Sequence, residues 1–189
     1  MLTNNVIQPK SPVREFLDQS PLKLFVGGEW VAASGNGSFA VLDPGTGEKL
    51  AAIASGTKED VDSAVEAAGK AFRESGWRTM LPSERAVYLH RLADLVEKHR
   101  DEIAEIESLD VGKPFAQAQS DVDNFSKTMG YYADISLHIQ YREPHAISPH
   151  EARTERQPYG ECGCLFPGKY TARRAGGGFA PAGAAGNTG

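Results

Sequence analysis

The chain has 189 residues, of which 40% are hydrophobic and 24% charged, and its formal net charge is -5. These values are typical of one globular domain with a hydrophobic core. The sequence has no apolar run long enough to span a membrane and no apolar secretory segment among its first residues. We therefore expect no membrane association and a cytoplasmic location. The negative charge also disfavours nucleic acid as a partner.

Residues 1–21 show no sustained apolar periodicity, so we expect them to form a loosely ordered leader. Short apolar runs separated by glycine turns follow, and they predict small antiparallel strands. One hairpin is expected to turn at residues 27–28. A second is expected to pair residues 39–43 with residues 49–54.

Helices are predicted in the middle of the chain. Thr57 and Asp60 have the spacing of a capping box and predict the start of a helix that ends near Gly76. Pro82 suits the first turn of a second helix. After a charged break at residues 98–102, the apolar positions continue, which predicts a third helix.

A long apolar stripe predicts one further helix after residue 114. Its members recur at steps of three and four residues, and they are Phe115, Ala118, Val122, Phe125, Met129 and Tyr132. We interpret this stripe as packing rather than as a cofactor site. Asp121 and Asp123 are two residues apart on the same helix and therefore face apart, so we expect a solvated face and no shared acid-base role.

The last third of the chain is less regular. Three prolines interrupt residues 141–158, and residues 151–157 fit either an exposed polar strand or a linker. This stretch is our candidate for a domain boundary. From Tyr159 onward, the glycines at 176–178 and the arginine pair at 173–174 match neither a strand nor an amphipathic helix. We expect this segment to be unable to fold as written.

Residues Gly163–Lys169 match the start of a phosphate-binding loop, G-x-x-x-x-G-K, in which backbone amides and the lysine bind phosphate. Tyr170 occupies the next position, where the full motif has the hydroxyl side chain that holds magnesium. A nucleotide-binding loop is therefore kept as a minor alternative.

The cysteines and histidines do not form a metal-binding pattern. Cys162 and Cys164 have no second cysteine pair, and we expect buried thiols rather than nucleophiles or zinc ligands. The five histidines lack ligand spacing, and we expect most of them at the surface: His90, His99, His138, His145 and His150. We predict no metal site.

Several motifs, taken in order, resemble the NAD(P)-dependent aldehyde dehydrogenase superfamily. They are Phe25–Trp30, Asp43–Gly47, Glu107–Pro114, Arg156–Gly160, Ala180–Ala182 and Ala184–Thr188. The resemblance covers about residues 22–188, although members of the family are more than twice as long. It implies an α/β fold of which this chain is the amino-terminal portion, with an incomplete parallel sheet.

The resemblance also implies how the chain is divided. Residues 22–140 would be the helical and edge-strand part of the cofactor-binding domain, and residues 141–158 an excursion resembling an oligomerisation strand. Residues 159–189 would begin the first βαβ unit.

The activity implied by the resemblance is oxidation of a small aldehyde to a carboxylic acid with NAD or NADP. In this reaction a cysteine attacks the aldehyde and a glutamate activates water. Both catalytic segments would lie after Gly189, and Cys162 and Cys164 do not match the nucleophile. We therefore expect this chain alone to be inactive, and the full-length enzyme to be a homo-oligomer. The alternative is a noncatalytic product that only associates with full-length relatives.

One functional element of the family would lie within the chain, where members usually read P-W-N-[FY]-P. By this resemblance Leu165, Phe166, Pro167 and Gly168 would contact the cofactor. Lys169 stands where the family has the asparagine that stabilises the substrate oxyanion, and a lysine supplies charge without the same fixed donor geometry.

Gly168 and Gly177 stand where the family has tryptophan. Each of these changes, like that at Lys169, can arise from one base becoming G. We hypothesise sequence error or gene decay.

Overall fold

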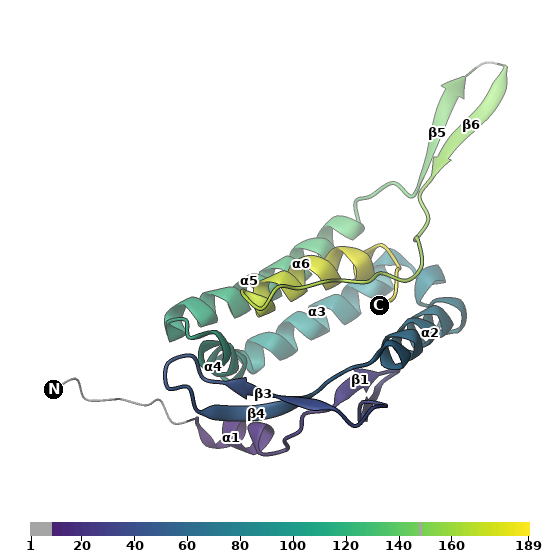
Figure 1. The fold of residues 1–189 in the computed structure, drawn as a ribbon. Coiled ribbons are helices and arrows are strands. Elements are labelled where there is room, and N and C mark those ends of the chain that lie inside the picture. Colours follow the sequence, from purple (N-terminus) through teal and green to yellow (C-terminus); the bar gives the residue numbers. More distant parts are fainter. Residues whose placement is uncertain (1–8, 148) are drawn as a thin grey trace.

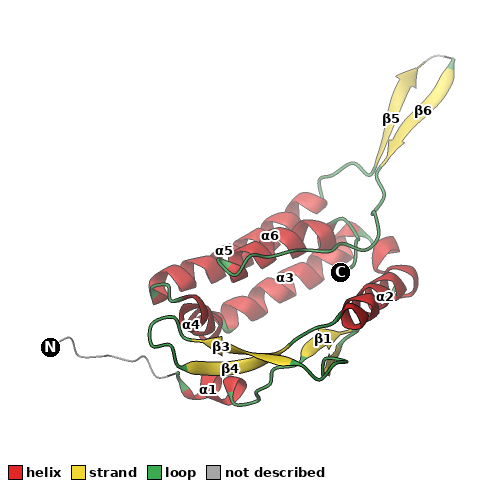
Figure 2. Ribbon diagram, in the orientation of Figure 1, coloured by secondary structure: helices red, strands yellow, loops and turns green. Residues whose placement is uncertain are grey.

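The computed structural model describes residues 9–147 and 149–189 and has a mixed α/β fold, as expected (Figures 1 and 2). Three helices lie side by side in one layer: α3 (Pro82–Lys98), α5 (Phe115–Ser136) and α6 (Thr171–Ala184). Helix α4 (Arg100–Val111) packs across one end of this layer, and the first four strands lie below it.

A short helix, α1 (Ser11–Leu17), forms where we expected only a loosely ordered leader, so that expectation is wrong for these residues. Val13 and Leu17 are buried and pack with Leu109 of α4 and Ala51. Two apolar residues one turn apart are enough for a helix when a distant partner covers them, and such a partner leaves no local sequence signal. Residues 1–8 of the predicted leader lie outside the described residues.

The two predicted amino-terminal hairpins are confirmed. Strands β1 (Leu24–Val26) and β2 (Glu29–Val31) are antiparallel, as are β3 (Ser38–Leu42) and β4 (Lys49–Ala54). Gly27 and Gly28 join the first pair with φ values of 61° and 89°, which glycine adopts without a steric penalty.

The predicted capping box begins helix α2 (Lys58–Glu74). The Thr57 hydroxyl accepts the Asp60 amide, and the Asp60 carboxylate accepts the Thr57 amide at 2.8 Å. This backbone hydrogen bond lowers the pKa of Asp60, against the opposing effect of burial. A short 3-10 turn, η1 (Trp77–Thr79), follows α2 and leads into α3.

The apolar stripe of α5 forms the centre of the helical layer, which confirms its interpretation as packing. Buried residues of α5 contact α3 and α6 in one cluster and α4 in another; they are Ala118, Val122, Phe125, Met129 and Ala133. The break at residues 98–102 separates α3 from α4, as predicted.

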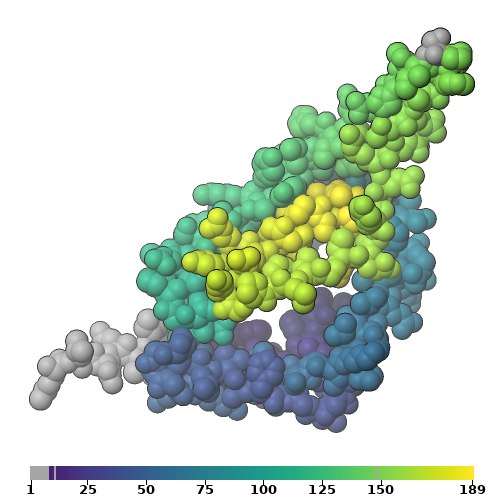
Figure 3. Space-filling model, turned by 45° about the horizontal axis from the view of Figure 1, so that its top comes forward, coloured from purple at the N-terminus to yellow at the C-terminus, as the bar shows by residue number. Residues whose placement is uncertain are grey.

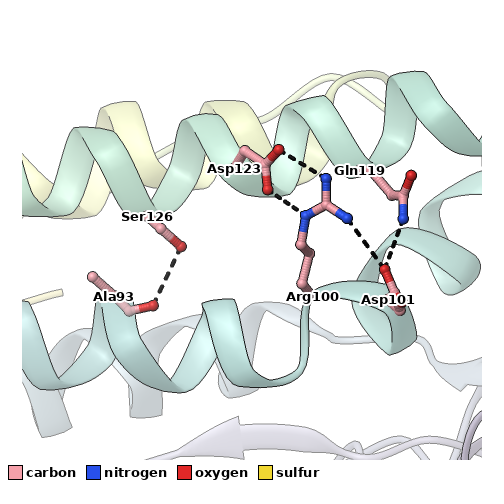
Figure 4. A network of polar contacts seen from close by, with 6 residues as sticks. All are labelled: Ala93, Arg100, Asp101, Gln119, Asp123 and Ser126. Atoms are coloured by element: carbon pink, nitrogen blue, oxygen red, sulfur yellow. Dashed lines mark hydrogen bonds and ion pairs between the residues drawn. The ribbon is translucent and has the colours of Figure 1, made fainter.

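Asp121 and Asp123 do face apart, but the prediction of a solvated face is wrong for Asp121, which is 7% exposed and paired with Lys113. Asp123 accepts two hydrogen bonds from Arg100, one of them at 2.9 Å (Figure 4). The bond from Arg100 lowers the pKa of Asp123. Sequence spacing gave the directions of the two carboxylates but not their partners on other elements.

Strands β5 (Arg142–Ile147) and β6 (His150–Glu155) form an antiparallel hairpin that projects from the helical layer (Figures 1 and 3). Of the two structures considered for residues 151–157, the exposed polar strand is the one found, up to Glu155. Residue 148 lies outside the described residues.

Residues 171–184 form helix α6, so the expectation that the segment from Tyr159 cannot fold is wrong. Gly176, Ala180 and Ala184 are buried against α3 and α5. A Cβ added at Gly176 would lie 3.0 Å from the Phe125 Cα, so α6 approaches α5 closely because its facing residues are small. Tertiary packing compensates for the low helix propensity of three consecutive glycines.

Candidate cofactor-binding site

A parallel backbone pair flanks α6. Glu161 and Thr188 form a parallel bridge, in which the Cys162 amide donates to the Thr188 carbonyl at 2.7 Å and the Thr188 amide donates to Gly160 at 3.1 Å. Two parallel segments joined by a helix are the unit from which cofactor-binding α/β sheets are built. In such sheets ligands bind beyond the carboxyl ends of the strands, and residues 163–170 occupy that position.

The four predicted cofactor-binding residues lie on this connecting segment, which runs over the surface before α6 (Figure 3). The Leu165 side chain is fully exposed, whereas the Phe166 ring packs edge-on against Phe179 with centroids 5.9 Å apart. Pro167 and Gly168 follow, both exposed, and a Cβ added at Gly168 would meet no atom within 4 Å. The same is true at Gly177, so both positions have room for a larger side chain.

Lys169 lies at the end of this segment with an exposed side chain. Its amide donates to the Pro167 carbonyl at 2.7 Å, which makes the chain turn just before α6. Tyr170 is the residue preceding the helix and has a left-handed backbone with φ of 54°.

A buried ionic cluster lies against the Tyr170 ring, and no sequence pattern predicted it. The Lys113 ammonium bonds to Glu107 and, at 2.8 Å, to Asp121. It also lies 4.7 Å from the centroid of the Tyr170 ring. The only sequence signal for this cluster was a lysine in the loop between two predicted helices. Its partners could not be predicted, because they lie on two different helices.

Asp110 lies near the cluster and senses its charge. Burial, followed by the charge of Glu107, raises the pKa of Asp110. For Lys113, burial opposes the charged form, but hydrogen bonds to Asp121 and Glu107 outweigh it and raise the pKa. The lysine is therefore held as a cation.

The phosphate-loop alternative has a helix after Lys169, but not the enclosing loop. Cys164 and Phe166 lie against Gly178 and Phe179 of α6, so this part of the segment packs along the helix beyond its first turn. Arrangement of the segment therefore favours an extended surface contact over a cradle of amides.

The expectation that both thiols are buried is wrong, because Cys164 is exposed and Cys162 only partly covered. Both cysteines lie on the surface segment between the parallel bridge and α6. All five histidines are exposed, as predicted. Within the described part of the chain, no three histidine, cysteine, aspartate or glutamate residues gather in a way that could hold a metal ion. No helix among residues 9–147 and 149–189 is long and apolar enough to cross a membrane.

A parallel segment pair with a helical crossover and an exposed connection at its carboxyl end defines the class of cofactor-binding α/β folds. Within that class, the profile described as "Aldehyde dehydrogenase family" matches residues 30–189. The chain belongs to the aldehyde dehydrogenase family.

Among similar proteins, the mitochondrial benzaldehyde dehydrogenase of Antirrhinum majus is 40% identical over 167 residues, which are 88% of this chain and 31% of that protein. Retinaldehyde dehydrogenase 3 of Mus musculus is 37% identical and is matched over 94% of this chain and 35% of its own length. The chain thus spans about a third of the length of the curated relatives it matches.

Solved structures of aldehyde dehydrogenases have the same fold over nearly all of this chain. The NAD+ complex of an aldehyde dehydrogenase from Bacillus cereus has a TM-score of 0.91 and 34% identity, covering 96% of this chain and 37% of that one. Betaine aldehyde dehydrogenase from Staphylococcus aureus, also with NAD+, has a TM-score of 0.87 and 27% identity, covering 94% and 35% of the two chains.

Proposed function

We propose that this chain supplies the amino-terminal part of an enzyme that oxidises an aldehyde to a carboxylic acid with NAD+ or NADP+. The observation that carries the proposal is the exposed segment Leu165–Gly168 at the carboxyl end of a parallel-paired segment. Its geometry fits a flat cofactor, because Leu165 offers a free apolar side chain and Gly168 leaves space beside it. NAD(P)+ would accept hydride from the substrate.

Lys169 has a defined place in this proposal. Its ammonium has no hydrogen-bond or ion-pair partner among the described residues, so it is free to approach a negative oxygen on the substrate. Its flexible side chain must be ordered before it can stabilise an oxyanion, whereas a short amide side chain is held by its backbone. We therefore propose that Lys169 supports catalysis weakly.

We also propose that the 189 residues alone do not turn over. The reaction needs a cysteine nucleophile, and among the described residues no histidine, carboxylate or lysine side chain hydrogen bonds to the thiol of Cys162 or Cys164. The nucleophilic cysteine and the glutamate would come from further family segments, through attack on the aldehyde to give a cysteine thiohemiacetal.

A chimera tests the role of Lys169. Residues 22–189 would replace the matching segment of the Bacillus cereus enzyme, and aldehyde-dependent reduction of NAD+ would be measured. We expect slow oxidation that rises roughly a hundredfold with Lys169→Asn, since one oxyanion donor contributes about that factor. The far-ultraviolet spectrum and NAD+ affinity of both chimeras serve as controls. Equal rates for both folded chimeras would contradict the proposal.

Resequencing the codons for Gly168, Lys169 and Gly177 tests the proposed sequence error. Open space around both glycines is consistent with tryptophan at these positions in the parent enzyme. Confirmation of all three codons would leave gene decay or a genuine change of the site.

The β5–β6 hairpin supports a second candidate function, association with full-length relatives without catalysis. The hairpin projects from the body, and its strands pair only with each other among the described residues. Unpaired strand edges are templates for pairing with another chain. The same surface would serve homo-oligomer formation in a full-length enzyme.

Coexpression with an affinity-tagged intact relative tests this association. Because Arg142 and Glu155 are paired across the hairpin, a two-glycine link can replace the residues between them without moving the ends. Copurification that is lost on this replacement supports the candidate, and copurification that persists contradicts it.

The relatives include proteins named as cytosolic and as mitochondrial, so a cytoplasmic location is also a proposal, checked by cell fractionation.

A further inference from the structure

The buried ionic cluster joins three separate parts of the chain. Glu107 lies on α4, Lys113 in the connection that follows it, and Asp121 on α5, with side-chain exposures of 5%, 11% and 11%. The Ser108 hydroxyl donates to the Lys113 carbonyl at 2.7 Å and fixes the backbone of that connection. A charged group this well buried is costly unless it is paired, so the lysine is held tightly in place.

The cluster extends to the start of α6 through two contacts. The Ala172 amide donates to the second oxygen of Glu107 at 3.3 Å, and this amide belongs to the first turn of α6. The Lys113 ammonium lies over the Tyr170 ring at 4.7 Å from its centroid. A cation at this distance is attracted by the electrons of the ring face, most strongly where water is excluded.

Tyr170 requires such support because of its backbone. A left-handed conformation is unfavourable for a bulky residue and persists only where the surroundings impose it. No side-chain hydrogen bond caps α6, so the usual means of fixing a helix start is absent at this position. The contacts from Lys113 and Glu107 take its place.

We propose that Lys113 is a positioning residue for the segment that precedes α6. Its ammonium, fixed between Glu107 and Asp121, holds the Tyr170 ring and so keeps Tyr170 in the left-handed conformation. Lys169 is the preceding residue, so its direction follows from this arrangement. Only the consequence for catalysis rests on the proposed function; the positioning itself does not.

Amide hydrogen exchange in the full 189-residue chain tests the proposal, since the Arg174 amide donates to the Tyr170 carbonyl at 2.9 Å and reports its position. Lys113→Met and Tyr170→Leu should each speed exchange at Arg174 by about threefold to tenfold, the range that a partly desolvated cation–π contact provides. The double variant should exchange like Lys113→Met alone, because that change already removes the contact that Tyr170→Leu removes.

Conservative variants separate positioning from a general structural role. Tyr170→Phe keeps the ring and should exchange like the wild type, and Lys113→Arg keeps the cation and should restore most of the protection. Tyr170→Gly should relieve backbone strain while losing the ring, so Lys113→Met should have no added effect at Arg174 in that background. Amides within α2 serve as a reference that none of these changes should alter.

Two results would overturn the proposal: unchanged exchange at Arg174 in Tyr170→Leu, or fully additive effects in the double variant. If Lys113→Met does not fold, Tyr170→Leu and Tyr170→Phe still decide, because they leave the ionic cluster intact. Aldehyde oxidation by the chimera is a separate measurement. The chimera can be inactive although the Lys113 and Tyr170 changes alter exchange at Arg174 as predicted, or active although they do not, so the two proposals can fail separately.

Discussion

The helices α3 to α5 and the segment from residue 159 to 189 are both folded, but different kinds of side chain form their helix interfaces. In the first region, large apolar side chains such as Met129 and Phe125 fill the space between helices. In the second, α6 has alanine and glycine at the interface and packs by close approach of backbones. A stripe of large apolar side chains predicts a buried helix face from the sequence alone. Alanine and glycine indicate such a face only when the opposing helix is known.

The largest expected effect tests the first region. Met129 is 1% exposed, and Met129→Ala removes most of a buried side chain, so we expect a loss of about 3 kcal/mol in the free energy of unfolding. Val87→Ala on the exposed side of α3 is the matched control and should change it by less than about 0.5 kcal/mol. Urea unfolding followed by circular dichroism measures both. Equal costs for the two variants would mean that this cluster is not the packed core.

A pair of adjacent glycines tests the second region. Gly177→Ala meets no atom within 4 Å and should stabilise α6 by about 0.5–1 kcal/mol through helix propensity. At Gly176 the added Cβ lies 3.0 Å from the Phe125 backbone, so Gly176→Ala should instead destabilise by about 1–2 kcal/mol. The same urea titration gives both values. A stabilising Gly176→Ala would show that α6 does not depend on close backbone contact.

The smallest expected effect is on the loss of folding stability at low pH. Arg100 lowers the pKa of Asp123 in the folded chain, so this carboxylate contributes stability above its unfolded pKa of about 3.9. That contribution is lost as the pH falls through the lower folded value. Because Asp123 is about one third exposed, we expect less than about 1 kcal/mol.

Asp123→Asn should therefore reduce the decline in stability between about pH 5 and pH 2, as measured by urea unfolding at a series of pH values. Arg100→Gln should reduce it in the same way, because it removes the cause of the shift. A decline unchanged in both variants would mean that another carboxylate governs acid unfolding.

The sequence predicted most elements of the fold for identifiable physical reasons. The capping box at Thr57, the glycine turn at residues 27–28 and the stripe of α5 are local signals, and each formed as predicted. Helix α1 and helix α6 were missed because their stability comes from contacts with residues far away in sequence.

The candidate site shows the same division. The family resemblance predicts that Leu165–Gly168 contact the cofactor, and this stays a prediction; the side chains that support the segment could not be read from the sequence. That support comes from Glu107, Lys113 and Asp121, which lie on different elements and meet only in the folded chain. Resemblance therefore pointed to the residues that we propose face the cofactor, and the structure identified the side chains packed against the start of α6.

We propose that these 189 residues contain a segment that contacts the cofactor but not the nucleophile of the reaction. An activity assay tests this most directly. The purified 189-residue chain would be incubated with NAD+ or NADP+ and a set of aldehydes, and the absorbance of the reduced cofactor would be followed. We predict no aldehyde-dependent reduction above the protein-free rate. Turnover by this chain that is abolished by Cys162→Ser or Cys164→Ser would contradict the account, since it would place the nucleophile within these residues.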